Sequence, residues 1–216
     1  MLIVLTNYPA MPKFTDDMTN RRASVPHRTY EAVVIGVSSG GVEALSMILP
    51  RLTADFACAV IVVQHVHPHS KNFLVTHLQA RCRIPVKEAE EKEAIQSGRI
   101  YLAPPNYHLL VEQSKTFSLS SGQRENYARP AIDVLFETAA EVYQHKLIGV
   151  ILTGANRDGS KGLQTIQQCG GVTVVQHPAT AKVAAMPCAA IELTAVDYVL
   201  PLSEIGDLLN RLSARA

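Results

Sequence analysis

The nine residues from 33 to 41, Val-Val-Ile-Gly-Val-Ser-Ser-Gly-Gly, place the strongest constraint on how this chain folds. A β-branched run ends in a glycine-rich turn with Ser38 at its tip, and a helical pattern follows. Gly36-Val37-Ser38-Ser39-Gly40 fits the G-x-S-x-G nucleophile elbow, which occupies a sharp strand-to-helix turn. The free N–H groups at the start of the following helix also suit a phosphate. The turn is therefore either a nucleophile elbow or a phosphate cradle.

After residue 30, apolar runs alternate with helical patterns. The runs that predict buried parallel strands are Ala32–Val37, Ala57–Gln64, Leu147–Thr153 and Gly171–Gln176. Helices are predicted over Val42–Leu52, Lys71–Ala80, Ala131–Tyr143, Gly159–Cys169 and Pro201–Ser213. This alternation is typical of an α/β fold, with a doubly wound and mostly parallel sheet covered by helices on both faces. Three short strands near residues 99–103, 108–112 and 116–120 are predicted to form a meander.

Composition narrows the class of protein. The chain is 47% hydrophobic with a formal net charge of +1, which gives no electrostatic case for nucleic acid or a membrane surface. Its four cysteines form no C-x-x-C pair, which favours a reducing cytoplasm. No apolar run has the length of a bilayer span. After an apolar start of six residues, which leaves an edge strand as an alternative, the chain up to residue 29 is mixed and polar. Residues 1–29 are therefore predicted to be a poorly ordered extension, and the compact domain is predicted over 30–216.

Polar side chains follow three of the predicted strands. Ser38 follows the first, His65 the second, and Asp158 lies just beyond the third. Because the carboxyl ends of parallel strands share one edge of a sheet, these residues are expected to converge there. They are the nucleophile, base and orienting carboxylate of acyl-transfer catalysis. Two alternatives stay open: Asp158 as a simple helix cap, and His177, at the end of a later strand, as a rival base.

Two other site chemistries are less well supported. The alternating histidines His65, His67 and His69 suggest zinc, but Pro68 interrupts them and no acidic ligand follows. A dinucleotide site favours an acidic residue at the end of the second strand, where this chain has Gln64. Neither a metal nor an organic cofactor is therefore expected.

Several separate motifs give the chain from about Tyr30 to Leu212 a resemblance to the catalytic domain of the chemotaxis protein-glutamate methylesterases (CheB). They are Ile35-Gly-Val-Ser-Ser-Gly-Gly41, Gln64-His65, Tyr101-Leu-Ala-Pro104, Arg129-Pro-Ala-Ile-Asp-Val-Leu-Phe136, Ile151-Leu-Thr-Gly154 with Asp158-Gly159, and Met186-Pro187. The resemblance implies Ser38 as nucleophile, His65 as base and Asp158 as third triad member. It also implies an oxyanion hole of the Ser39 and Ala155 backbone amides, and a three-layer fold with a small β-hairpin insertion around residues 99–120.

The implied reaction is demethylation of glutamate γ-methyl esters on methyl-accepting chemotaxis receptors, with glutamine deamidation as a second activity. The family usually has Met-Gly-Asn before the aspartate, whereas this chain has Ala155-Asn156-Arg157. Residues 1–29 are too few for the family's usual receiver domain, so control by phosphorylation within this chain is not expected. The remaining alternatives are a non-catalytic methylesterase-like adaptor, a Rossmann-like nucleotide-binding module and a zinc hydrolase.

Overall fold

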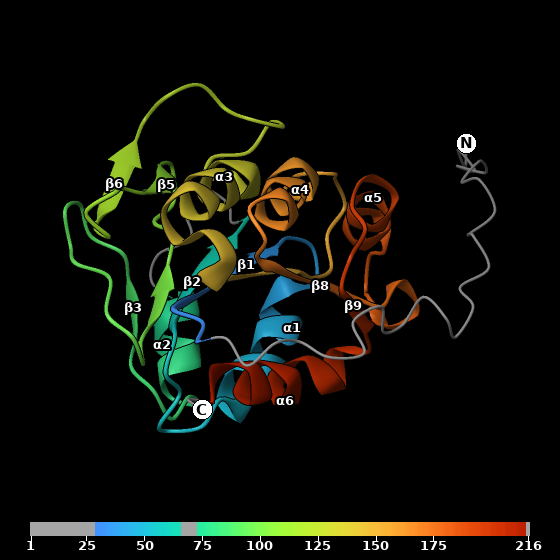
Figure 1. Cartoon of the computed structure of the whole chain (residues 1–216), viewed down its shortest axis with the longest axis horizontal. Helices are drawn as coiled ribbons and strands as arrows, with labels where there is room; N and C mark the ends of the chain where they lie inside the picture. The colour runs from blue at the N-terminus through green and yellow to red at the C-terminus, as the bar shows by residue number, and fades with distance from the viewer. Residues whose placement is uncertain (1–28, 66–72, 215–216) are drawn as a thin grey trace.

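A computed structural model describes residues 29–65 and 73–214 of the chain. Its centre is a parallel sheet of seven strands in the order β3-β4-β2-β1-β7-β8-β9, beside a two-stranded antiparallel hairpin of β5 and β6 (Figure 1). The strands are β1 (Ala32–Val37), β2 (Ala59–Gln64), β3 (Val86–Glu88), β4 (Ile100–Leu102), β5 (His108–Val111), β6 (Phe117–Ser120), β7 (Leu147–Ile151), β8 (Val172–Gln176) and β9 (Tyr198–Leu200).

Helices cover both faces of the sheet, as Figure 1 shows, with α3, α4 and α5 on one face and α1, α2 and α6 on the other. The α-helices are α1 (Gly41–Ile48), α2 (Phe73–Gln79), α3 (Ile132–Tyr143), α4 (Ser160–Gln168), α5 (Ala185–Leu193) and α6 (Leu202–Ser213). Short 3-10 turns lie at Leu49–Arg51, Gln144–Lys146 and Pro178–Thr180. The predicted three-layer, doubly wound α/β fold is confirmed.

The central strand β1 divides the core into two. All six of its residues are buried, and successive side chains point to opposite faces of the sheet. Val33, Ile35 and Val37 belong to the cluster that includes α1 and α6 residues, whereas Ala32 and Val34 belong to the cluster that includes α3 residues. A strand that is buried on both faces needs an unbroken run of apolar residues. For this reason the apolar run 32–37 predicted the strand from the sequence.

The order of the strands reverses at β1. From β1 the chain passes to β2, then to β3 at the edge of the sheet and back to β4 between β2 and β3, and it then restarts on the other side of β1 with β7, β8 and β9. In open α/β sheets, ligands bind beyond the carboxyl ends of the strands at such a reversal. The register pairs Val37 with Gln64 and Gly36 with Ile151, so β2, β1 and β7 end at nearly the same level.

The predicted meander is wrong in one strand. The segment predicted at 99–103 forms β4, which pairs in parallel with β2 and β3 inside the main sheet, and only β5 and β6 form a hairpin. Residues 100 and 101 of β4 explain this placement, because the Ile100 and Tyr101 side chains are fully buried in the main sheet. A small exposed hairpin would not bury them. Strands β3 and β9 and helix α5 were not predicted; the two strands have only three residues each.

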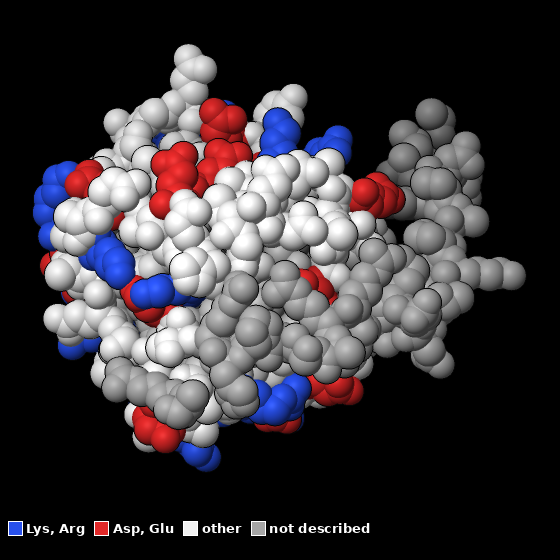
Figure 2. Space-filling view, in the orientation of Figure 1, with Lys and Arg blue, Asp and Glu red and all other residues white. Residues whose placement is uncertain are grey.

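The surface agrees with the balanced composition. On the face seen in Figure 2, acidic and basic side chains are intermixed near the edges and uncharged side chains fill much of the middle. Pairs such as Lys87–Glu93 and Lys92–Glu112 account for part of this mixing. Within residues 29–65 and 73–214, no helix is long and apolar enough to span a membrane. The predicted extension, apart from Thr29, and the histidines at 67 and 69 lie outside the described residues.

Helices α3 and α4 pack closely at Gly162, which gives a test of the fold. A Cβ at this position would lie 2.4 Å from Phe136 Cβ and 3.1 Å from the Asp133 carbonyl oxygen. Gly162→Ala should therefore lower the free energy of unfolding by about 1–3 kcal/mol in urea titrations, although alanine favours a helix. Gly122→Ala is the control, because its Cβ would meet only Ser120 Oγ at 3.2 Å. Equal stability of the two variants would contradict the close packing.

Candidate active site

Ser38 lies directly after β1, in the turn that leads into α1. Gly40 caps this helix in the left-handed region, with φ of 84°, which glycine adopts without steric cost. A Cβ at Gly41 would lie 1.8 Å from Gln64 Oε1, so the side chain of Gln64 occupies the space that this glycine leaves. The glycines of the motif therefore serve the shape of the turn and its close contact with the neighbouring strand.

Two side chains hold the carbonyl groups of the turn. Gln64 Nε2 donates to the carbonyl oxygens of Ser38 at 3.0 Å and His65 at 2.9 Å. From the other side, Thr153 Oγ1 donates to the Ser39 carbonyl oxygen at 2.8 Å. The turn is thus fixed from β2 and from the end of β7. The sequence places Gln64 at the end of a strand, but its bridging role depends on side-chain direction, which no sequence pattern reveals.

His65 lies beside Ser38, as the strand ends predict. Its backbone N–H donates to the Val37 carbonyl oxygen at 3.1 Å, which fixes the histidine next to the end of β1. Its Nε2 lies 2.8 Å from Asp158 Oδ2, and its side chain is 14% exposed. Among the described residues no hydrogen bond joins Ser38 Oγ to His65. Nucleophile–base contacts are often loose in enzymes without substrate and tighten on binding.

Asp158 is fully buried, and its carboxylate is surrounded by donors. Besides His65, it accepts from the backbone N–H groups of Ile132 at 2.7 Å and Asp133 at 3.1 Å, and from Asn126 Nδ2 at 3.0 Å. Burial alone raises the pKa of this carboxyl, but the hydrogen bond from His65 and those from the two amides outweigh it, and the net pKa is lowered. Asp158 is therefore held as the charged carboxylate.

The alternative that Asp158 simply caps the following helix is wrong. Asp158 does not cap α4, whose N-cap is Gly159 without a side-chain hydrogen bond. It binds instead the first two amides of α3, a helix distant in sequence. The positive end of that helix dipole favours the carboxylate charge. One residue thus serves the start of α3 and orients the histidine.

A second buried carboxylate, which the sequence analysis did not place in the site, lies beside the first. Asn126 Nδ2 donates to Asp133 Oδ2 at 2.9 Å as well as to Asp158 Oδ1, and the Gly162 N–H donates to Asp133 Oδ1 at 2.8 Å. The pKa of Asp133 is raised, mainly because of burial and also because the charge of Asp158 is close. The Asn126 amide therefore donates to both carboxylates and offsets part of their mutual repulsion.

The predicted oxyanion amides lie at the turns that follow β1 and β7. In the part of the chain that the structure describes, the N–H groups of Ser39 and Ala155 have no hydrogen-bond acceptor, whereas the neighbouring N–H groups of Ser38 and Gly154 are bonded to Thr153 and Val183. Both Ser39 and Ala155 are exposed. Unused N–H groups beside a nucleophile suit a developing oxyanion, and this role remains a prediction.

The structure gives less support to His177 as the base and to the metal hypothesis. His177 follows β8, which β7 separates from β1, and its Nδ1 accepts the Ala179 N–H at 3.2 Å. It thus caps a 3-10 turn. Over residues 29–65 and 73–214, no three His, Cys, Asp or Glu side chains are arranged as metal ligands.

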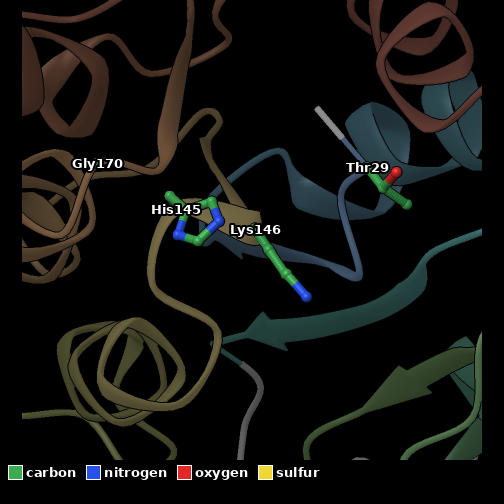
Figure 3. A pocket seen from close by; sticks show the side chains of 4 residues that line it. All are labelled: Thr29, His145, Lys146 and Gly170. Carbon is green, nitrogen blue, oxygen red and sulfur yellow. The ribbon is translucent and has the colours of Figure 1, made fainter. Parts of the chain in front are cut away.

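A cavity of about 660 Å³ lies at the opposite end of the sheet, where β7 begins (Figure 3). Figure 3 shows His145 and Gly170 on one side of it and Thr29 on the other, with Lys146 extending between them. The Lys146 Nζ donates to Glu31 Oε1 at 2.6 Å, so a carboxylate already balances its charge. None of the predicted site residues lines this cavity.

Comparisons with known proteins identify a family that this chain is similar to. The family model described as CheB methylesterase matches residues 33–209. A Leptospira interrogans protein that bears a protein-glutamate methylesterase/protein-glutamine glutaminase name is 57% identical over 183 residues, which are 85% of this chain and 95% of that protein. A Trichodesmium erythraeum protein-glutamate methylesterase/protein-glutamine glutaminase is 35% identical over 97% of this chain, which spans 60% of that longer protein.

The same similarity is found among solved structures. The crystal structure of the Thermotoga maritima CheB methylesterase catalytic domain matches with a TM-score of 0.82 and 38% sequence identity. The match covers 86% of this chain and 100% of that domain.

The bridge at Asn126 gives a prediction about pH. Asn126→Ala removes a donor from two carboxylates and should lower the free energy of unfolding at pH 7 by about 1–3 kcal/mol. The pKa of Asp158 is lowered in the folded protein, so the stability that its ionised carboxylate contributes is present above the pKa of aspartate in the unfolded chain, about 3.9. This stability is lost as the pH falls through the pKa of Asp158 in the folded state. The difference from wild type should therefore shrink in urea titrations below about pH 4. Gln123→Ala, at an exposed neighbouring position, is the control. If Asn126→Ala loses the same free energy of unfolding at every pH, the result argues against the charge effect.

Proposed function

The chain belongs to the CheB methylesterase family, and on this premise we propose that it removes methyl groups from glutamate γ-methyl esters of chemoreceptors by Ser-His-Asp acyl transfer. Ser38 is the nucleophile, His65 the base and Asp158 the orienting carboxylate. The observation that carries the proposal is the 2.8 Å contact between His65 Nε2 and a buried, ionised Asp158, beside the turn that presents Ser38.

The orientation of His65 assigns a role to each ring nitrogen. A charged Asp158 accepts the Nε2 proton, which leaves Nδ1 without a proton and free to act as the base. Nδ1 then takes the Ser38 hydroxyl proton as Ser38 Oγ attacks the γ-carbonyl carbon of the ester. Asp158 holds the imidazole in this tautomer and stabilises the imidazolium that forms.

Backbone amides stabilise the tetrahedral intermediate. The N–H groups of Ser39 and Ala155 bind its oxyanion, and one such donor contributes on the order of 3–4 kcal/mol in related sites. A backbone donor does not depend on its side chain, so alanine in place of the family's usual methionine leaves this function intact. Protonated His65 then gives its proton to the leaving methoxide, and methanol departs.

Water completes the reaction. His65 deprotonates the water as the water oxygen attacks the acyl carbon, and then returns this proton to Ser38 Oγ as the acyl–oxygen bond breaks, which leaves a glutamate carboxylate on the substrate and a free Ser38 hydroxyl. A glutamine side chain reacts by the same steps with ammonia as the leaving group, which corresponds to the glutaminase activity in the relatives' names. No step uses a metal or an organic cofactor.

The substrate is a methylated receptor segment that reaches the cytoplasm, and the cytoplasm is where we place this protein. The mixed surface charge in Figure 2 favours a polypeptide partner over nucleic acid, because no broad basic field covers the face shown. The exposed Arg157, at a position where the family usually has asparagine, adds a cation to the rim of the site.

Replacing the nucleophile tests the mechanism. Ser38→Ala should fold as the wild type does, because Ser38 is partly exposed at a turn and contributes little packing. Release of methanol from a methylated receptor fragment should fall by a factor on the order of 10⁴ or more. Circular dichroism serves as the control for folding. Turnover that persists in the folded variant would show that another group is the nucleophile.

A pair of histidine variants tests the choice of base. His65→Gln should abolish methanol release, because it removes the group between Ser38 and Asp158. His177→Gln should reduce the rate only slightly, since His177 caps a turn beyond β8. Both variants should be compared at equal concentrations of folded protein. A larger loss in His177→Gln than in His65→Gln would reverse the assignment.

A further inference from the structure

The loop between β6 and α3 carries an unusual turn. The backbone groups of Glu125 and Ala128 bond to each other in both directions, at 3.1 and 2.8 Å, and enclose Asn126 and Tyr127. Both enclosed residues have positive φ, of 50° and 64°. Two such residues between reciprocal hydrogen bonds match the tight type I′ turn, which favours Asn followed by Gly. Figure 1 shows this loop projecting beyond α3.

Tyrosine is a poor choice for the second position of that turn. Asparagine tolerates the left-handed region, whereas a bulky side chain is strained there. Over residues 29–65 and 73–214 no packing compensates for this strain, because Tyr127 is 95% exposed. Among the described residues its side chain has no hydrogen bond or ring contact. The fold itself therefore gives no reason for an aromatic ring where glycine fits better.

The position of the turn supplies a reason. The Asn126 side chain is fixed between Asp133 and Asp158, the triad acid, and the Cα of Tyr127 lies about 3.8 Å from the Cα of Asn126. Arg129 Nη1 donates to the carbonyl oxygens of Ser121 and Gly122 and closes the base of the loop. The ring of Tyr127 is thus exposed to solvent on the turn that also carries the contact to the triad acid.

We propose that Tyr127 binds the polypeptide segment of the substrate that carries the reacting glutamate side chain. The inference rests on the proposed methylesterase function and adds to it a residue that determines preference for protein substrates. A tyrosine ring offers a large, rigid contact area with few rotatable bonds, so little side-chain entropy is lost on binding. Tyr127 touches no reacting atom of the ester in this scheme. Its contribution belongs to KM and not to kcat.

The test compares two substrates with Tyr127→Gly. One is a chemoreceptor cytoplasmic fragment with radiolabelled methyl esters, and the other is the γ-methyl ester of N-acetylglutamate amide. For the fragment, kcat/KM should fall about tenfold through KM, which is the effect of removing one central aromatic contact. For the small ester it should not change. The melting temperature should stay the same or rise, because glycine relieves the left-handed strain.

Two variants serve as controls. Tyr127→Phe keeps the ring and should retain activity on the fragment. Lys92→Gly removes another exposed residue with positive φ, of 62°, near the hairpin and away from the site, and should leave both activities unchanged. If Tyr127→Gly does not fold, Tyr127→Asn replaces it, because asparagine tolerates the same backbone conformation.

Each remaining outcome has a defined meaning. An unchanged rate on the fragment, or an equal loss on both substrates, overturns the role of Tyr127 in substrate binding. A wild-type protein that demethylates neither substrate overturns the proposed function itself. The two failures are therefore distinguishable in a single set of measurements.

Discussion

The buried charge of Asp158 is the constraint around which the site is built. A carboxylate without exposure to water is costly unless donors surround it. The donors here come from three separate parts of the chain: the first amides of α3, the Asn126 amide and the His65 ring. Meeting this need places α3 against the end of β7 and fixes the β6–α3 loop. It also fixes the His65 ring through Nε2, which leaves Nδ1 for the base role proposed above. The stability of this region and the proposed catalytic geometry thus depend on the same set of hydrogen bonds.

Much of the arrangement was predictable, because it follows from the sheet. The long buried strands and the helices between them are visible as apolar runs and helical spacing, and the rule that parallel strands end at one edge brings Ser38, His65 and Asp158 together. The three-residue strands are too short for any periodicity to show. The placement of β4 depends on which partner strand covers it, and its sequence allows both a sheet interior and a hairpin. Residue 126 lies in a polar loop, where a bridging asparagine looks like any other turn residue.

The elbow is held in place from both of its neighbouring strands. Its carbonyl groups are bound from β2 by Gln64 and from the segment after β7 by Thr153. The Ser38 N–H donates to the Thr153 carbonyl oxygen and the Gly41 N–H to the Ser38 carbonyl oxygen, whereas the Ser39 N–H has no acceptor among the described residues. This distribution fits the proposed oxyanion site and a glutamine, rather than an acidic residue, at the end of β2. A carboxylate at that position would place negative charge beside the oxyanion and could not donate to either carbonyl.

The reversal of strand order at β1 also has a consequence for how the chain folds. His65 and Asp158 are separated by 93 residues, and the sheet connects them only after β7 has docked on β1. Contacts of such long sequence separation close late, because the entropy of the intervening loop is lost before they form. A nascent chain that has emerged only as far as β4 holds Ser38 and His65 but no acid to orient the histidine. On the proposed mechanism, the chain therefore gains its full set of site residues only with the second half of the sheet.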